Sequence, residues 1–293
     1  MLEFLALVLQ DSTPVAYAAL AAVLAQRSGI FNLGLEGLMI VGSFSGVIVT
    51  AQTGSLMAGV GTAIAACVLM SALLWWVVQK LGADPVIAGL GVSGLGLGGT
   101  HFALQAIYGS DGTVQAPAKI PSLSFLPGPL GNLSVLVGLL PVVMVGVWIY
   151  MYRTRRGLQL TACGEHPFAA RAVGVSPARR RLEVLCLGGV LCALAGLELA
   201  MGNLQSFGVG MTSGRGYLAL AVAIFGLGHP IGAVVASSFF GILDYLDIKA
   251  QIGLGNAIPP QLIQALPYIA TVAGTWLTAV LRPQVNRYDE LRD

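Results

Sequence analysis

Residues 153–181 read RTRRGLQLTACGEHPFAARAVGVSPARRR, and this stretch decides how the rest of the chain is interpreted. It holds seven of the fifteen lysine and arginine residues of the chain. Long apolar runs lie on both sides of it. A basic stretch between apolar runs is typical of a cytosolic loop in a protein that crosses the bilayer several times.

The composition agrees with a membrane location. Of the 293 residues, 56% are hydrophobic and only 10% are charged, whereas soluble domains carry about 25% charged residues. The 39 glycines fit as well, because close helix packing in lipid favours small residues. The net charge of +2 is too small to indicate a nucleic-acid partner. We therefore expect an all-α polytopic membrane protein, with residues 1–293 forming a single transmembrane domain.

The apolar runs give the expected spans. A helix needs about 20 apolar residues to cross the hydrocarbon core, and this predicts about nine spans, within a range of roughly eight to ten. We place them at residues 4–25, 36–51, 56–79, 86–107, 133–152, 182–202, 215–228, 230–247 and 261–281. The N-terminal run is expected to be the first span rather than a signal peptide, because no basic residues precede it.

The basic residues beside these spans predict an orientation, since cytosolic loops carry an excess of lysine and arginine. An outside N-terminus and a cytosolic C-terminus place twelve basic residues in the cytosol and three outside. The twelve are Arg27, Lys80, the seven arginines of residues 153–181, Arg282, Arg287 and Arg292; the three are Lys119, Arg215 and Lys249.

Two glycine-rich passages interrupt the apolar runs. Residues 27–37 read RSGIFNLGLEG, and residues 207–216 read FGVGMTSGRG. Broken helices in the two halves of a chain are typical of inverted repeats around a translocation path. Non-helical backbone at membrane depth is tolerated where it is buried in protein or lines water. The two passages lie in spans predicted to run in the same direction, so the sequence leaves the inversion itself open.

The outer loop at residues 108–132 contains four prolines and four glycines, so no long helix is expected there. It either contacts a partner outside the membrane or simply connects two spans.

The sequence offers little that resembles an active site. Residues 89–94 match the pattern GxGxxG, but they lie inside an apolar run, so helix-packing glycines fit better than a dinucleotide site. The dipeptide Gly-Lys of a phosphate-binding loop never occurs. The cysteines and histidines lack metal-ligand spacing. We therefore expect no catalytic residue, metal site or cofactor in this chain, and any ATP must bind another chain.

Several polar and aromatic residues near the spans can line a path, because amides hydrogen-bond polar ligands and phenylalanine stacks on planar rings. They can equally hold helices together. The candidates are Asn32, Glu36, Gln105, Asn203, Phe207 and Asn256. Among the acids, we expect Glu36 to pair with Arg27, and Glu183 with Arg179 or Arg180.

The middle of the basic loop has a pattern of its own. Pro167 can occupy the first position of a helix, with Glu165 near the positive end of its dipole. Gly174 can end that helix. A short helix that presents Phe168 suits insertion into a groove on a partner. The candidate docking residues are Gly164, Glu165, His166, Pro167, Phe168, Ala169, Ala170, Arg171 and Gly174.

These residues resemble a known family, the permease subunits of bacterial binding-protein-dependent ABC importers for branched-chain amino acids, simple sugars and nucleosides. The pairs Gly164-Glu165, Ala169-Ala170 and Gly174-Val175 match the family's coupling segment. Residues 27–39, RSGIFNLGLEGLM, are very similar to the signature of the simple-sugar and nucleoside branch, and residues 214–228 resemble a later stretch. The resemblance covers about residues 15–280; His166 and Cys163 depart from it.

The resemblance implies a permease of the bacterial inner membrane that imports a nucleoside, purine-like base or simple sugar. An extracytoplasmic binding lipoprotein would deliver the ligand, and ABC ATPase subunits with ATP and Mg would dock on residues 164–174. A second permease would complete the path, as a heterodimer in preference to a homodimer. An ion-gradient-driven carrier is the alternative, although the sequence lacks a buried series of acids. An intramembrane enzyme fits least, because no nucleophile and base are paired.

Overall fold

The structure is a computed structural model that describes residues 2–109, 112–124 and 128–254. The described residues fall into two compact units, one ending at Gly241 and one beginning at Ile242. The expected ninth span, residues 261–281, and the path candidate Asn256 lie outside the described residues.

Six helices of the described part are long and apolar enough to cross a membrane. They are α1 (Leu2–Arg27), α2 (Leu35–Thr53), α3 (Leu56–Lys80), α4 (Pro85–Tyr108), α5 (Val135–Arg153) and α8 (Pro177–Leu197), which continues into the π-helix η2 (Glu198–Asn203). They match six of the expected spans with small shifts at their ends. The prediction of a polytopic helical protein is therefore confirmed.

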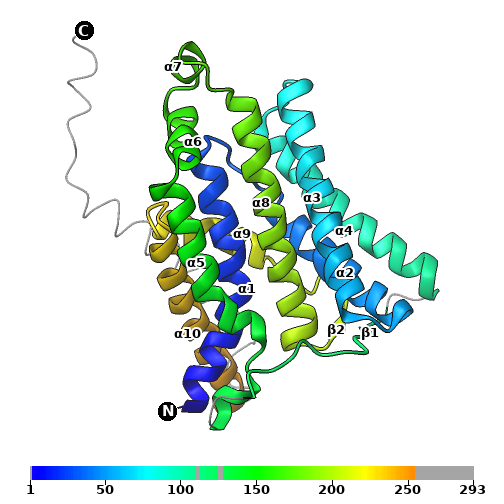
Figure 1. The fold of residues 1–293 in the computed structure, drawn as a ribbon. Helices are drawn as coiled ribbons and strands as arrows, with labels where there is room; N and C mark the ends of the chain where they lie inside the picture. Colours follow the sequence, from blue (N-terminus) through cyan, green and yellow to red (C-terminus); the bar gives the residue numbers. More distant parts are fainter. Residues whose placement is uncertain (1, 110–111, 125–127, 255–293) are drawn as a thin grey trace. The chain divides into compact units, whose positions relative to one another are not determined.

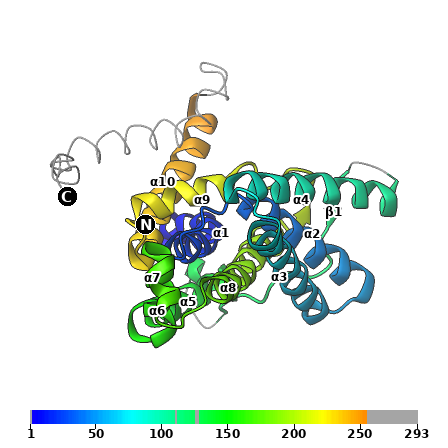
Figure 2. The same cartoon turned by 90° about the horizontal axis from the view of Figure 1, so that it is seen from above.

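Helix α1 occupies the centre of the first unit. Its residues 16–25 are at most 2% exposed, and most of them are alanine, which allows neighbouring backbones to come close. Figure 2 shows α1 with α5, α8 and α9 around it. The hydroxyl of Tyr17 donates a 2.7 Å hydrogen bond to the carbonyl of Leu136 and so ties α1 to α5. Helix α8 packs in turn on α2 and α3.

Glycines bring α2 and α4 into close contact. A Cβ atom on Gly96 would lie 2.7 Å from the Cα atom of Gly37. The hydroxyl of Ser93 adds a 2.8 Å hydrogen bond to the carbonyl of Leu33. The GxGxxG residues lie inside α4, as expected, but only Gly89 packs closely, against Leu33; Gly91 and Gly94 face open space among the described residues.

Four further α-helices lie in the described residues: α6 (Arg155–Glu165), α7 (Pro167–Ala172), α9 (Arg215–Phe225) and α10 (Pro230–Leu254). Figure 1 shows α6 and α7 at the end of the first unit where α5 ends and α8 begins. Helix α9 has only 11 residues, about 16 Å of helix. The expected span at residues 215–228 is therefore corrected to a helix too short to cross a bilayer.

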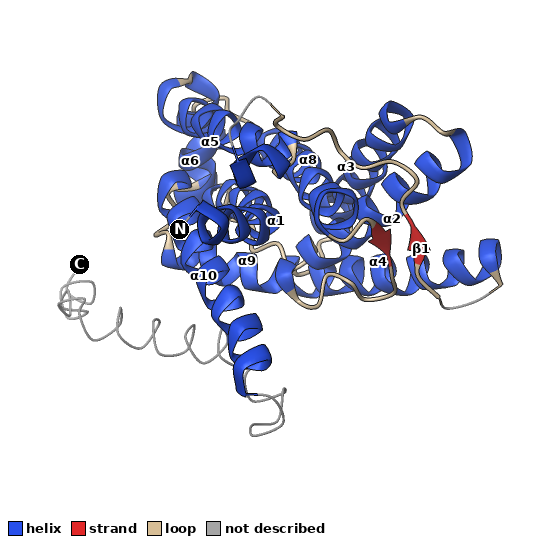
Figure 3. Ribbon diagram, turned by 90° about the horizontal axis from the view of Figure 1, so that it is seen from below, coloured by secondary structure: helices blue, strands red, loops and turns tan. Residues whose placement is uncertain are grey.

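The connection between α4 and α5 forms no long helix in its described residues, as expected. It contains the 3₁₀ helix η1 (Gly128–Asn132) and the two-residue strand β1 (Val114–Gln115). Strand β1 pairs antiparallel with β2 (Ser206–Phe207), with Val114 opposite Phe207. Figure 3 shows the two strands beside α2 and α4. The connection is thus joined to the passage that leads into α9.

Candidate coupling segment and path elements

The basic loop folds into two short helices whose ends follow from its sequence. Thr154 caps α6, because its hydroxyl accepts a 3.1 Å hydrogen bond from the amide of Gly157. Pro167 occupies the start of α7, as predicted. Gly174 has φ = +82°, and the next amide, of Val175, donates to the carbonyl of Ala170 at 2.9 Å. Gly174 therefore ends this turn in a conformation that glycine favours.

Helix α7 presents one large apolar side chain to solvent. Phe168 is 81% exposed, and the guanidinium of Arg171 lies over its ring at 5.7 Å. Ala170, on the inner side, is buried. The remaining docking candidates lie on the same two helices and their ends: Glu165, His166, Ala169 and Gly174 are exposed, and Gly164 and Pro167 are half-buried. The structure thus brings all nine candidates into one segment.

The same segment packs directly on the turn between α1 and α2. A Cβ atom on Gly164 would collide with the carbonyl oxygen of Arg27, and one on Gly29 would lie 3.2 Å from the Cα atom of Gly164. Arg181 donates a 3.2 Å hydrogen bond to the carbonyl of Ser28. The neighbouring Cys163 is buried, and this burial raises the pKa of its thiol although nearby arginines oppose the shift. The two backbones can touch only because both positions are glycine.

Arg27 reaches from this turn to the far end of α9. Its Nε donates to the carbonyl of Gly228 at 3.1 Å, and its Nη2 donates to the hydroxyl of Tyr152 at 3.1 Å. The ring of Tyr152 stacks on His229, with centroids 5.2 Å apart. Arg27 therefore links α1, α5 and the residues that follow α9.

Glu36 has other partners than the expected Arg27. Its Oε1 accepts hydrogen bonds from the Thr212 hydroxyl at 2.5 Å and the Gly214 amide at 2.9 Å. Its Oε2 accepts from the Gly216 amide at 2.7 Å. The carboxylate is 3% exposed and lies at the positive N-terminal end of α9. The pairing with Arg27 was wrong because the unpaired amides at the start of α9 take both carboxylate oxygens, while Arg27 binds Gly228 and Tyr152 instead.

The expected pairing of Glu183 with Arg180 is confirmed. Arg180 contacts the Glu183 carboxylate at 2.6 Å, and Arg156 contacts its other oxygen at 3.2 Å.

The other described path candidates fall in different settings. Asn32 is 3% exposed, and its side-chain oxygen accepts a 2.8 Å hydrogen bond from the amide of Gly34. Phe207 is fully buried, with its ring edge-on to Phe44 at 5.2 Å. Asn203 is half-buried and Gln105 is exposed. Within the described chain, Asn32 and Glu36 bind protein backbone, and their role in lining a path stays a prediction.

Two long-range contacts were not predicted from the sequence. Thr212 binds Glu36 across 176 positions, and Arg27 binds Gly228 across 201 positions. The glycine-rich character of both passages signals that close backbone approach occurs, but it does not say which passages approach each other.

Residues 4–274 match the family described as branched-chain amino acid transport system / permease component. The chain belongs to this family. The predicted family is thereby confirmed.

Several relatives of this permease are named for the solutes that they transport. It is 32% identical to the guanosine ABC transporter permease protein NupQ of Bacillus subtilis, over 89% of this chain and 87% of NupQ. It is 30% identical to the putative glucose ABC transporter permease protein TsgC13 of Haloferax volcanii, over 90% of this chain and 88% of TsgC13. It is 26% identical to a second guanosine permease protein of Bacillus subtilis, NupP, over 80% of this chain and 70% of NupP. No solved structure matches this permease significantly.

Proposed function

We propose that this permease is the membrane subunit of an ATP-driven importer in the bacterial inner membrane, with its N-terminus outside. Its ligand is a nucleoside, purine-like base or simple sugar, delivered by an extracytoplasmic binding lipoprotein. The guanosine and glucose permeases among its relatives support these ligand classes. ATP and Mg bind separate ATPase subunits.

One observation carries the proposal: the segment that exposes Phe168 packs on the turn that holds α9. Through Gly164 and Gly29 the segment touches the turn between α1 and α2. From that turn Arg27 binds Gly228, just beyond the end of α9. A displacement of α7 by a docked ATPase subunit therefore has a continuous, closely packed route to α9.

Helix α9 has the features of a moving element. It is held at one end by Glu36 and at the other by Arg27. Ser213 and Leu227, which flank it, have φ angles of +46° and +56°, a strained region for residues other than glycine. The backbone at both positions can relax when α9 shifts. We therefore assign α9 the role of the gate that opens and closes the translocation path.

A second permease completes the path in this proposal. Bacillus subtilis has two permease proteins named for guanosine, and this chain is similar to both. We therefore favour a heterodimer with a related but different subunit.

The test is ligand uptake into proteoliposomes that contain the full transporter and its binding protein. We expect ATP-dependent uptake of a nucleoside or simple sugar that stops when the ATPase subunit carries a catalytic lesion. Uptake that persists with the lesion, or uptake by this chain alone under an ion gradient without ATP, would contradict the proposal.

A further inference from the structure

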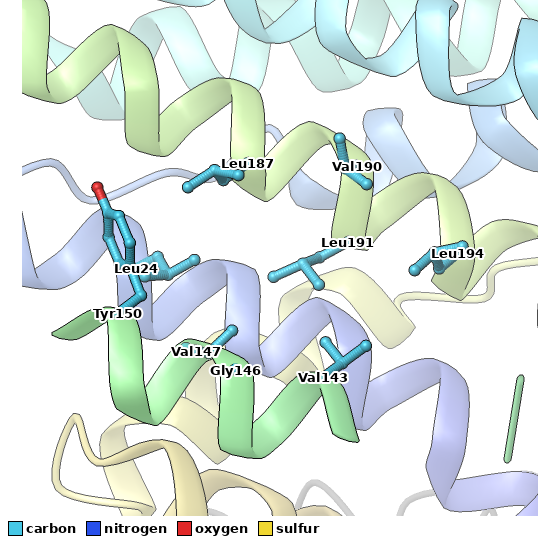
Figure 4. Close-up of a pocket in the computed structure, with 9 residues that line it drawn as sticks. All are labelled: Leu24, Val143, Gly146, Val147, Tyr150, Leu187, Val190, Leu191 and Leu194. Atoms are coloured by element: carbon cyan, nitrogen blue, oxygen red, sulfur yellow. The ribbon is translucent and has the colours of Figure 1, made fainter. Parts of the chain in front are cut away.

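An apolar groove runs between α5 and α8, with α1 as its floor. Its volume is about 330 Å³. Val143 and Val147 line one wall, Leu187, Val190 and Leu194 line the other, and Leu24 lies between them. Figure 4 shows Leu187 and Leu191 of α8 on one side of the gap and Val143 and Val147 of α5 on the other. All three helices are candidate membrane spans, so the groove lies at the depth of lipid chains.

The groove is open along one side among the described residues. Leu187 at its rim is 39% exposed, and Gly146 on α5 is exposed, with nothing within 4 Å of an added Cβ atom. From Val143 to Tyr150, α5 rises about 10 Å. A slot of this length, with apolar walls, accepts part of an extended hydrocarbon chain.

At the end nearest the basic loop, the residues beside the groove change from apolar to charged. Tyr150 closes the lining on α5, and Arg153 follows three positions later on the same face. On α8 the face of Leu187 continues to Glu183 and Arg180. Three arginines, counting Arg156 of α6, and one carboxylate therefore gather at this mouth.

The charges at the mouth are not balanced. Glu183 binds both Arg156 and Arg180, so it neutralises one of these two charges. Arg156 keeps 67% of its side chain exposed. Arg153 is exposed and lies 5.6 Å from the ring of Trp148, as at a membrane interface. The mouth therefore carries excess positive charge beside an apolar slot.

Tyr150 adds a polar group to this mouth. Its hydroxyl is buried and lies beside the Glu183 carboxylate, which is the nearest acceptor. Buried hydroxyl groups are almost always paired, and the position of Tyr150 therefore helps to fix the Glu183 carboxylate at the mouth.

We propose that this groove binds one anionic phospholipid of the leaflet that faces the basic loop. One acyl chain lies along Val143, Val147 and Leu191, and the phosphate lies near Arg153 and Arg156. Basic pockets between membrane helices bind anionic head groups by the same chemistry. The bound lipid would brace α5 against α8 beside the segment that carries α7.

The test is lipid retention by the full-length permease, purified with its partner subunits in mild detergent. The complex is exchanged into phosphatidylglycerol or phosphatidylcholine, and bound lipid is counted by native mass spectrometry. We expect wild type to keep one phosphatidylglycerol molecule per chain after delipidation. Gly146→Leu should fill the groove and reduce retention about tenfold. Gly61→Leu, at an exposed glycine of α3 with equally open space, should retain the lipid.

A second pair of variants keeps the groove intact and changes only charge. Arg153→Gln with Arg156→Gln should lower the preference for phosphatidylglycerol over phosphatidylcholine about tenfold. Arg179→Gln, an exposed arginine on another face of α8, should leave the preference unchanged.

Two results would overturn the proposal. One is equal lipid retention by wild type and Gly146→Leu. The other is efficient cross-linking of a cysteine at Val143 to another polypeptide in native membranes, which would make the groove a protein interface.

Discussion

The carboxylate of Glu36 accepts a 2.5 Å hydrogen bond from Thr212, although 176 positions separate the two residues. It also binds the amides of Gly214 and Gly216, so one side chain satisfies the start of α9. Glu36 belongs to the first glycine-rich passage and Thr212 to the second. The breaks in two apolar runs are thus two halves of one buried junction, which explains how polar backbone is accommodated at membrane depth.

The first prediction concerns this junction. Glu36→Gln keeps the size of the side chain but replaces one acceptor oxygen by an amide donor, which faces N–H groups. We expect amide hydrogen exchange at Gly214 and Gly216 to rise at least about tenfold, since bonds to a charged acceptor contribute about 1.5–3 kcal/mol. Glu165→Gln, an exposed carboxylate on α6, is the control and should not change exchange there. Unchanged protection of residues 212–218 in Glu36→Gln would show that the junction is not held this way.

The second prediction concerns the contact between Gly164 and Arg27. An alanine methyl group at position 164 would collide with the Arg27 carbonyl, so the two backbones must separate. We expect Gly164→Ala to destabilise the protein by about 1–3 kcal/mol, measured by thermal unfolding in detergent. Gly61→Ala has open space around the new methyl group and should be neutral or slightly stabilising. Equal unfolding temperatures for the two variants would argue against close packing of the loop on the turn.

The third prediction separates packing glycines from exposed ones within α4. Gly89→Ala places a methyl group 2.8 Å from the amide nitrogen of Leu33, whereas Gly94→Ala meets nothing within 4 Å. The first change should lower the unfolding temperature and the second should not, because only the first forces α4 away from its neighbour. The reverse order would contradict this assignment of the GxGxxG residues.

The fourth prediction tests whether Arg27 holds α9. Arg27→Gln removes the bonds to both Gly228 and Tyr152, whereas Tyr152→Phe removes only the second. We expect ligand uptake by the full transporter to fall about tenfold in Arg27→Gln and about twofold in Tyr152→Phe, in line with the strengths of the bonds lost. Uptake that falls equally in both variants would assign the effect to the tyrosine rather than to α9.

The sequence predicts the helices of this protein better than it predicts their junctions. Long apolar runs give six spans with small errors at their ends, because a membrane span is set by local hydropathy and length. Pro167 and Gly174 likewise mark the short helix α7, since both residues act through local backbone geometry. These features depend on near neighbours in the chain.

The errors occur where distant segments meet. Residues 215–228 are apolar enough for a span, but α9 ends at Phe225, after only 11 residues. The partner of Glu36 was assigned to Arg27, nine positions away, because a charge pair is the contact that sequence proximity offers. The true partners are the Thr212 hydroxyl and the backbone amides of Gly214 and Gly216. No residue pattern shows that this glycine-rich loop, rather than another one, supplies them.

A change at Phe168 tests whether a separate ATPase drives this permease through α7. Phe168→Ala removes an exposed ring without disturbing the buried side of the helix. The measurement is the number of ligand molecules imported per ATP hydrolysed in proteoliposomes, with Met57→Ala, another exposed apolar side chain, as the control. We expect Phe168→Ala to lower the number of ligand molecules imported per ATP about tenfold, or to release the ATPase, while membrane insertion stays normal. An unchanged ratio with the ATPase still bound would contradict it.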